Sequence, residues 1–156
     1  MLSKNDFIVI AHLRGNARES LTSLSKKTKI PVSTLFQKIK ENCAGAIIRH
    51  VSLVDWSLLG FSIKANIMLQ TEKVQREELK KYLSKEFHVN SVYRINNGYD
   101  FLVQGLFHNI GEAESWAECL EERFTIHKKD VHYIIEDLKV ESFMSDPTIV
   151  GLLSNI

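Results

Sequence analysis

The first third of the chain has apolar residues at the spacing of three short helices. Residues 5–14 form the first helix, which ends at Gly15, and a second begins at Ser20 and is broken before Pro31. A third helix is predicted over residues 32–42. The residues expected on its inner face are Leu35, Phe36, Ile39 and Cys43. Three short helices with a tight break before the third predict a helix-turn-helix domain.

After Gly45 the pattern becomes that of strands. Residues 46–54 are rich in β-branched residues and predict an extended linker strand, and Asn97-Gly98 predicts a tight hairpin. Alternation and helical spacing predict the remaining elements: strands over 61–69, 88–95, 101–106 and 131–140, and helices over 73–86, with Val74 inward, and over 110–124. This β-α-β-β-α-β order is the ferredoxin-like split unit, in which two helices cover one sheet face. A second subunit is the economical cover for the other face.

These elements predict an α+β fold with two domains. An N-terminal winged/helix-turn-helix three-helix domain is expected over residues 1–50, and a linker strand over 51–60 joins it to a ferredoxin-like βαββαβ domain over 61–143. A tail follows over 144–156. Within it, Ser145-Asp146-Pro147 is typical of a helix start. Two placements of the tail stay open, because it either packs against a neighbouring subunit or is frayed.

The distribution of charge separates the two ends of the chain. Residues 1–55 carry nine Lys and Arg against four Asp and Glu, a net charge of +5, whereas the rest carries 11 against 15, a net charge of −4. A basic end on a mildly acidic remainder suggests that one end meets a polyanion, although small segments also fluctuate by several charges. No run of ~18 apolar residues predicts a membrane span, and no apolar segment near Met1 predicts a secretory signal. With two distant cysteines, Cys43 and Cys119, a cytoplasmic location is expected.

The polar side of the third helix carries the groups that contact DNA in such domains. It is made up of Ser33, Thr34, Gln37, Lys38 and Glu41, with Lys40 beside it. Hydroxyl and amide groups bond to base edges, and lysines reach bases or phosphates. A solvated helix face explains the same pattern without DNA.

Motifs for catalysis and metal binding are absent from the sequence. It contains no Gly-x-Ser-x-Gly, no phosphate-binding glycine loop and no His-Glu-x-x-His. The six histidines are scattered, so no metal site, catalytic residue or cofactor is expected. Cys43 is expected to act as a small apolar residue of the third helix.

Three stretches together resemble a known family. They are Arg18-Glu19-Ser20-Leu21 through Pro31-Val32-Ser33-Thr34-Leu35, Gly45-Ala46-Ile47-Ile48 leading to Leu58-Leu59-Gly60, and Asn97-Gly98-Tyr99-Asp100-Phe101-Leu102. In their order and spacing, from about Asn5 to Glu141, the chain resembles the leucine-responsive regulator/asparagine regulator (Lrp/AsnC) family of transcription factors. It departs from that family in lacking arginines near Gln37 and Lys38 and in a third helix one residue short before Gly45.

The resemblance implies a homodimer, often assembled into tetramers or octamers, whose N-terminal domains bind spaced half-sites in duplex DNA. The DNA-facing residues it implies are Ser33, Thr34, Gln37 and Lys38, with Lys26, Lys27 and Lys29 as phosphate partners. It also implies an amino acid effector between paired C-terminal domains, near Gly98, Tyr99 and Asp100. Turn geometry alone explains Gly98 and Asp100 as well, since glycine supplies a positive φ and aspartate bonds to turn backbone.

Two other functions stay open at this point. The chain could be an interaction or assembly module that does not bind DNA. Siroheme decarboxylases resemble the same two-domain architecture, so the fold does not exclude an enzyme. Residues 91–100, however, lack the His-rich strand and the Tyr-Asn-x-Trp element of those enzymes.

Overall fold

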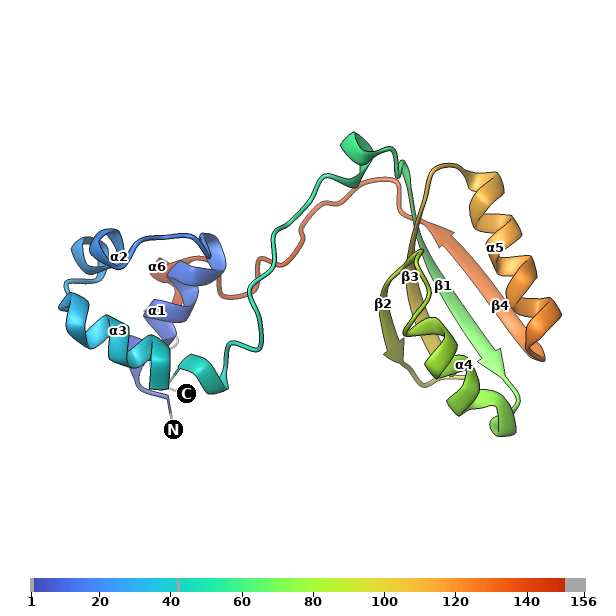
Figure 1. Cartoon of the computed structure of the whole chain (residues 1–156), viewed down its shortest axis with the longest axis horizontal. Coiled ribbons are helices and arrows are strands. Elements are labelled where there is room, and N and C mark those ends of the chain that lie inside the picture. Colours follow the sequence, from blue (N-terminus) through green and yellow to red (C-terminus); the bar gives the residue numbers. More distant parts are fainter. Residues whose placement is uncertain (1, 42, 151–156) are drawn as a thin grey trace. The chain divides into compact units, whose positions relative to one another are not determined.

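The structure is a computed structural model that describes residues 2–41 and 43–150 (Figure 1). The chain divides into two compact units. The first, here called the head, comprises the described residues up to Leu53 and from Leu138 onward, and the second, here called the body, is Val54–Asp137. The head is therefore built from two segments that are far apart in the sequence.

Three short helices form the head, as predicted. They are α1 (Lys4–Gly15), α2 (Leu21–Thr28) and α3 (Val32–Glu41), followed by the 3₁₀ turn η1 (Cys43–Gly45). Ser3 and Asp6 form a capping box at the start of α1, and Ser20 caps α2. A small apolar core joins the helices: Val9, Leu13, Leu24, Ile30, Leu35 and Cys43. Burial there raises the pKa of the Cys43 thiol, so this residue is an inert packing residue as expected.

The orientation of α3 differs from the prediction at Phe36. Phe36 was expected to face inward, but its side chain is 58% exposed. Successive residues of a helix differ by about 100°, and Leu35 already occupies the narrow core between the three short helices. Phe36 therefore faces solvent, and Ile39 is the second apolar residue of α3 against this core.

A buried ion pair connects α1 to α3. The Lys38 ammonium lies 2.7 Å from Asp6 Oδ1 and donates to Ser3 Oγ at 3.1 Å. Asp6 is 1% exposed, and its other oxygen accepts hydrogen bonds from the Ser3 amide and hydroxyl. A buried carboxylate needs such partners, because its desolvation is otherwise uncompensated.

The tail contacts α1 of its own chain. The Arg14 guanidinium donates to the carbonyl of Phe143 at 2.6 Å and to the carbonyl of Glu141 at 2.9 Å. The predicted helix start at Asp146-Pro147 is confirmed by α6 (Pro147–Val150). Val150 is buried, so this part of the tail belongs to the head rather than being frayed, whereas residues 151–156 lie outside the described residues.

The body has the predicted β-α-β-β-α-β order (Figure 1). Its elements are β1 (Ile63–Thr71), η3 (Lys73–Gln75), α4 (Arg76–Leu83), β2 (Val89–Arg94), β3 (Phe101–Phe107), α5 (Ile110–Arg123) and β4 (Ile126–Tyr133). The strands form one antiparallel sheet in the order β2-β3-β1-β4, which is the ferredoxin-like arrangement. None of the helices among the described residues is both long and apolar enough to cross a bilayer.

The core of the body lies between one sheet face and the two helices. Every second residue of β1 and β3 is buried in it, together with Leu79 and Leu83 of α4 and with Trp116 and Leu120 of α5. Leu106 of β3 is also buried, but the other alternate residues of β1 and β3 lie on the opposite sheet face, which has no helical cover in the described part of the chain.

Three sequence predictions for the linker and body are wrong. Residues 46–54 form no strand in the described structure, and Ile48 is 95% exposed, because a single chain offers this segment no neighbouring strand to pair with. The last strand is Ile126–Tyr133 rather than 131–140, since these are the residues that pair with β1. Val74 is 85% exposed, because it lies in η3 and not in the amphipathic helix that follows.

We expect the Asp6–Lys38 pair to determine the stability of the head. Lys38→Met removes the ammonium group that lies 2.7 Å from the buried Asp6 carboxylate, which should destabilise the head by about 3 kcal/mol. Amide hydrogen exchange of α1 and α3 measures this separately from the body and should become roughly a hundredfold faster. Lys40→Met, on the exposed side of the same helix, is the matched control. Equal exchange in the two variants would contradict the assigned role of the pair.

Candidate nucleic-acid interface and effector site

One side of α3 is exposed along its whole length. Ser33, Phe36, Gln37 and Lys40 have the spacing i, i+3, i+4, i+7, and all four are exposed. We call these four residues the α3 stripe. The Gln37 amide donates to Glu41 Oε2 at 3.2 Å, one turn further along the helix. The stripe thus presents a hydroxyl, an aromatic ring, an amide and an ammonium group to solvent.

The residues predicted to face DNA from α3 divide into two sets. Ser33, Thr34 and Gln37 are exposed. Lys38 is directed to the other side of the helix, where its ammonium is engaged by Asp6 and Ser3. Lys40, which the sequence placed beside the polar side, is the lysine on the exposed side of α3.

The three lysines predicted to meet phosphates lie at the end of α2. Lys26, Lys27 and Lys29 are all exposed, and Lys29 has a left-handed backbone with φ of 62° that ends the helix. Lys27 forms an ion pair with Glu19, which also accepts from the Ser23 hydroxyl at 2.8 Å. The hydrogen bonds from Lys27 and Ser23 lower the pKa of Glu19. Lys26 and Lys29 are therefore the better placed cations for a phosphate backbone.

The uncovered sheet face of the body, here called the open face, has a mixed row of side chains in its middle. Tyr93, Leu102, Met68 and Asp130 are register partners across β2, β3, β1 and β4 in turn. Tyr93 is exposed, and Leu102 and Met68 are partly exposed. Three large, partly apolar side chains therefore lie side by side on a face that faces no helix.

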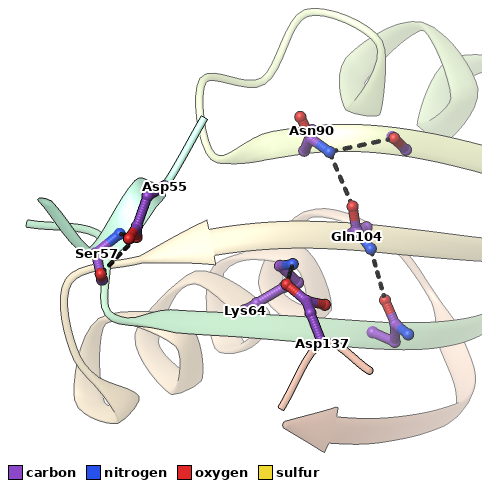
Figure 2. A network of polar contacts seen from close by, with 8 residues as sticks. Asp55, Ser57, Lys64, Asn90, Gln104 and Asp137 are labelled. Carbon is purple, nitrogen blue, oxygen red and sulfur yellow. Dashed lines mark hydrogen bonds and ion pairs between the residues drawn. The ribbon is translucent and has the colours of Figure 1, made fainter. Parts of the chain in front are cut away.

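A row of polar side chains lies next to it. Asn90 donates to Gln104 Oε1 at 2.8 Å, and Gln104 Nε2 donates in turn to Asn66 Oδ1 at 3.5 Å (Figure 2). These amides connect β2, β3 and β1 across the open face. The open face thus combines an apolar row with a hydrogen-bonded amide row, a composition typical of a specific protein interface.

The β2–β3 hairpin turns at Asn97-Gly98, as predicted. Both residues have positive φ, 61° and 86°, which is the geometry that favours glycine at the second position. Asp100 is buried and engaged within the body, because one carboxylate oxygen accepts from the Thr71 amide at 3.0 Å and the other lies 2.7 Å from Arg76 Nη2. Its role in the structure is to attach the hairpin to β1 and α4.

Tyr99 points toward two residues of β4 that the sequence did not single out. Its hydroxyl donates to Asp130 Oδ2, and the Lys128 ammonium lies 4.3 Å from the centre of its ring. The hydrogen bond with Tyr99 raises the pKa of Lys128. A carboxylate and an ammonium group thus lie together beside the hairpin. The one sequence feature that could have identified these two residues is the alternation along β4, since it places Lys128 and Asp130 on the same strand face.

Comparison by sequence relates the chain to regulators. No family model matches it. An uncharacterized HTH-type transcriptional regulator of Pyrococcus abyssi is 22% identical over 148 residues, which cover 94% of this chain and 100% of that protein. The HTH-type transcriptional regulator FL11 of the same organism is 26% identical over 120 residues, which cover 76% of this chain and 80% of FL11.

Solved structures similar to this fold are also transcriptional regulators. A transcriptional regulator of Neisseria meningitidis, solved as a complex with L-Met, has a TM-score of 0.82 at 19% identity, covering 90% of this chain and 94% of that one. LrpC of B. subtilis has a TM-score of 0.81 at 17% identity, covering 89% of this chain and 98% of LrpC. The chain is a homologue of HTH-type transcriptional regulators, and its fold is that of the Lrp/AsnC regulators.

Proposed function

We propose that this protein is a sequence-specific DNA-binding transcriptional regulator that acts as a dimer or higher oligomer. The observation that carries the proposal is the exposed α3 stripe on a three-helix head, in an N-terminal part of the chain, residues 1–55, that has a net charge of +5. A helix of this kind enters the major groove, where side chains on one face meet base edges. The homology to HTH-type regulators supports the same conclusion.

Contacts with phosphates supply affinity, and contacts with bases supply specificity. Lys26 and Lys29, exposed at the end of α2, serve the first role. Ser33, Thr34 and Gln37 serve the second, because hydroxyl and amide groups exchange hydrogen bonds with base edges. Gln37 exchanges its hydrogen bond to Glu41 for one to a base when DNA binds.

The dimer forms through the open face of the body. Its apolar row, Tyr93, Leu102 and Met68, loses contact with water when a second copy covers it, which favours association. The amide row beside it requires matched partners and so favours one register. Two heads on one dimer then bind half-sites about one helical turn apart.

A free amino acid is the proposed effector, bound beside the β2–β3 hairpin. Asp130 is suited to its ammonium group and Lys128 to its carboxylate, next to Tyr99 and the open turn at Gly98. The complex of a fold neighbour with L-Met supports this class of ligand. Such an effector changes DNA binding only if it binds two assembly states with different affinity.

Affinity for duplex DNA should fall steeply with salt. The double variant Lys26→Ala/Lys29→Ala should weaken binding to all sequences alike and reduce the slope of log affinity against log salt by about 0.9 per lost phosphate contact. Fluorescence polarisation on a fragment of the gene's own promoter measures this. Lys73→Ala/Lys85→Ala, two exposed lysines of the body, is the matched control. Salt-independent binding, or none at low salt, would contradict the proposal.

The open face should be required for dimer formation. Leu102→Glu places a charge in the middle of the apolar row and should convert the dimer to a monomer in sedimentation velocity, with an unchanged circular dichroism spectrum. Val74→Glu, at an exposed site in η3, should leave the dimer intact. A wild-type monomer would contradict the proposed dimer, and a Leu102→Glu variant that still dimerises would show that another surface is used.

At least one of the standard protein amino acids, added in free form, should shift the assembly state of the wild-type protein. Asp130→Asn removes the charge that receives the effector's ammonium group and should abolish the shift, whereas Glu114→Gln, exposed on α5, should retain it. Sedimentation with a panel of free amino acids gives the readout. The effector site is refuted by a panel without any effect, or by an Asp130→Asn variant that responds as the wild type does.

A further inference from the structure

The α3 stripe contains an apolar side chain that the DNA-binding residues predicted from the sequence do not include. Phe36 is 58% exposed in the middle of the stripe, and Val32, one turn before it, is 42% exposed. Residues at i and i+4 are neighbours on a helix surface, so the two form one apolar patch. This patch contributes nothing to the head core, which α3 reaches through Leu35 and Ile39.

The cationic groups on the same side of α3 are few. The helix contains two lysines and no arginine, and the Lys38 ammonium is held by Asp6 at 2.7 Å on the opposite side. Guanine is most often recognised by two hydrogen bonds from Arg or Lys to its O6 and N7 atoms. In this head Lys40 alone, among the described residues of the stripe, supplies such a group.

We propose that Phe36, together with Val32, binds the C5-methyl groups of thymines in the major groove of each half-site. Thymine is the base that presents an apolar group there, and phenylalanine is one of the side chains that contact it. Phe36 gives up no hydrogen bond on binding, whereas Gln37 must first release Glu41. The inference rests on the proposed DNA-binding function and specifies which base feature the head recognises.

The surroundings of Phe36 favour DNA over a protein surface as its partner. It lies between Ser33, Gln37 and Lys40, whose hydroxyl, amide and ammonium groups match base edges and phosphates. The N-terminal segment that contains it has a net charge of +5, which attracts a polyanion. An apolar group flanked in this way contacts a base methyl while its neighbours contact polar atoms of the same groove.

Replacing thymine by uracil removes this methyl group and keeps the base pairing. Duplexes are first selected by the wild-type protein from a random pool and then synthesised with thymine or with uracil in the bound half-sites. Wild-type affinity should fall about fourfold for each methyl group contacted, which is the value of one buried methyl-sized group. Phe36→Ala should lose most of the preference for thymine, because only Val32 and a single methyl group remain, and Phe36→Leu should keep more of it. Phe87→Ala, an exposed phenylalanine of the body, should behave as the wild type.

The outcomes separate this inference from the function on which it rests. A pool from which no duplex is selected at low salt refutes DNA binding itself. Selected duplexes that bind equally well with thymine and with uracil refute the contact made by Phe36 and leave DNA binding intact. If Phe36→Ala changes the sedimentation profile and retains the thymine preference, Phe36 contacts protein, and the inference is overturned.

Discussion

The buried ion pair between Asp6 and Lys38 determines which side of α3 faces solvent. It joins the capped first turn of α1 to the second turn of α3 and draws one lysine into the head. Because residue positions on a helix are fixed at about 100° intervals, drawing Lys38 inward turns Phe36 and Gln37 outward. The chemistry that the head offers to a groove follows from this one contact, and it is less cationic and more apolar than the sequence of α3 suggests.

The second constraint is the open face of the body, which no helix of the described chain covers. Both helices pack on one side of the sheet, so no helix of the described chain covers the apolar row and the hydrogen-bonded amide row of the open face. In the proposed dimer a second copy of the chain covers this face. The hairpin next to it brings Tyr99 to Lys128 and Asp130, which is where we propose that the effector binds.

Much of the fold could be predicted from local signals. Capping residues, proline and glycine predicted the three head helices. The alternation in β1 predicted a strand, and the Asn97-Gly98 turn predicted the β2–β3 hairpin. What could not be predicted depends on contacts between distant residues. Strand register places Lys128 and Asp130 beside Tyr99, and the long-range pair with Asp6 reverses the expected directions of Phe36 and Lys38. Residues 46–54 have strand propensity but no neighbouring strand, so propensity alone misassigned them.

The most direct test of the account is to locate the protein segment that touches bases. A selected duplex carrying 5-iodouracil is irradiated with the protein, and the cross-linked tryptic peptide is identified by mass spectrometry. We expect an adduct on the peptide of residues 30–38, at Phe36. Adducts confined to peptides of the body, with none on α3, would contradict it.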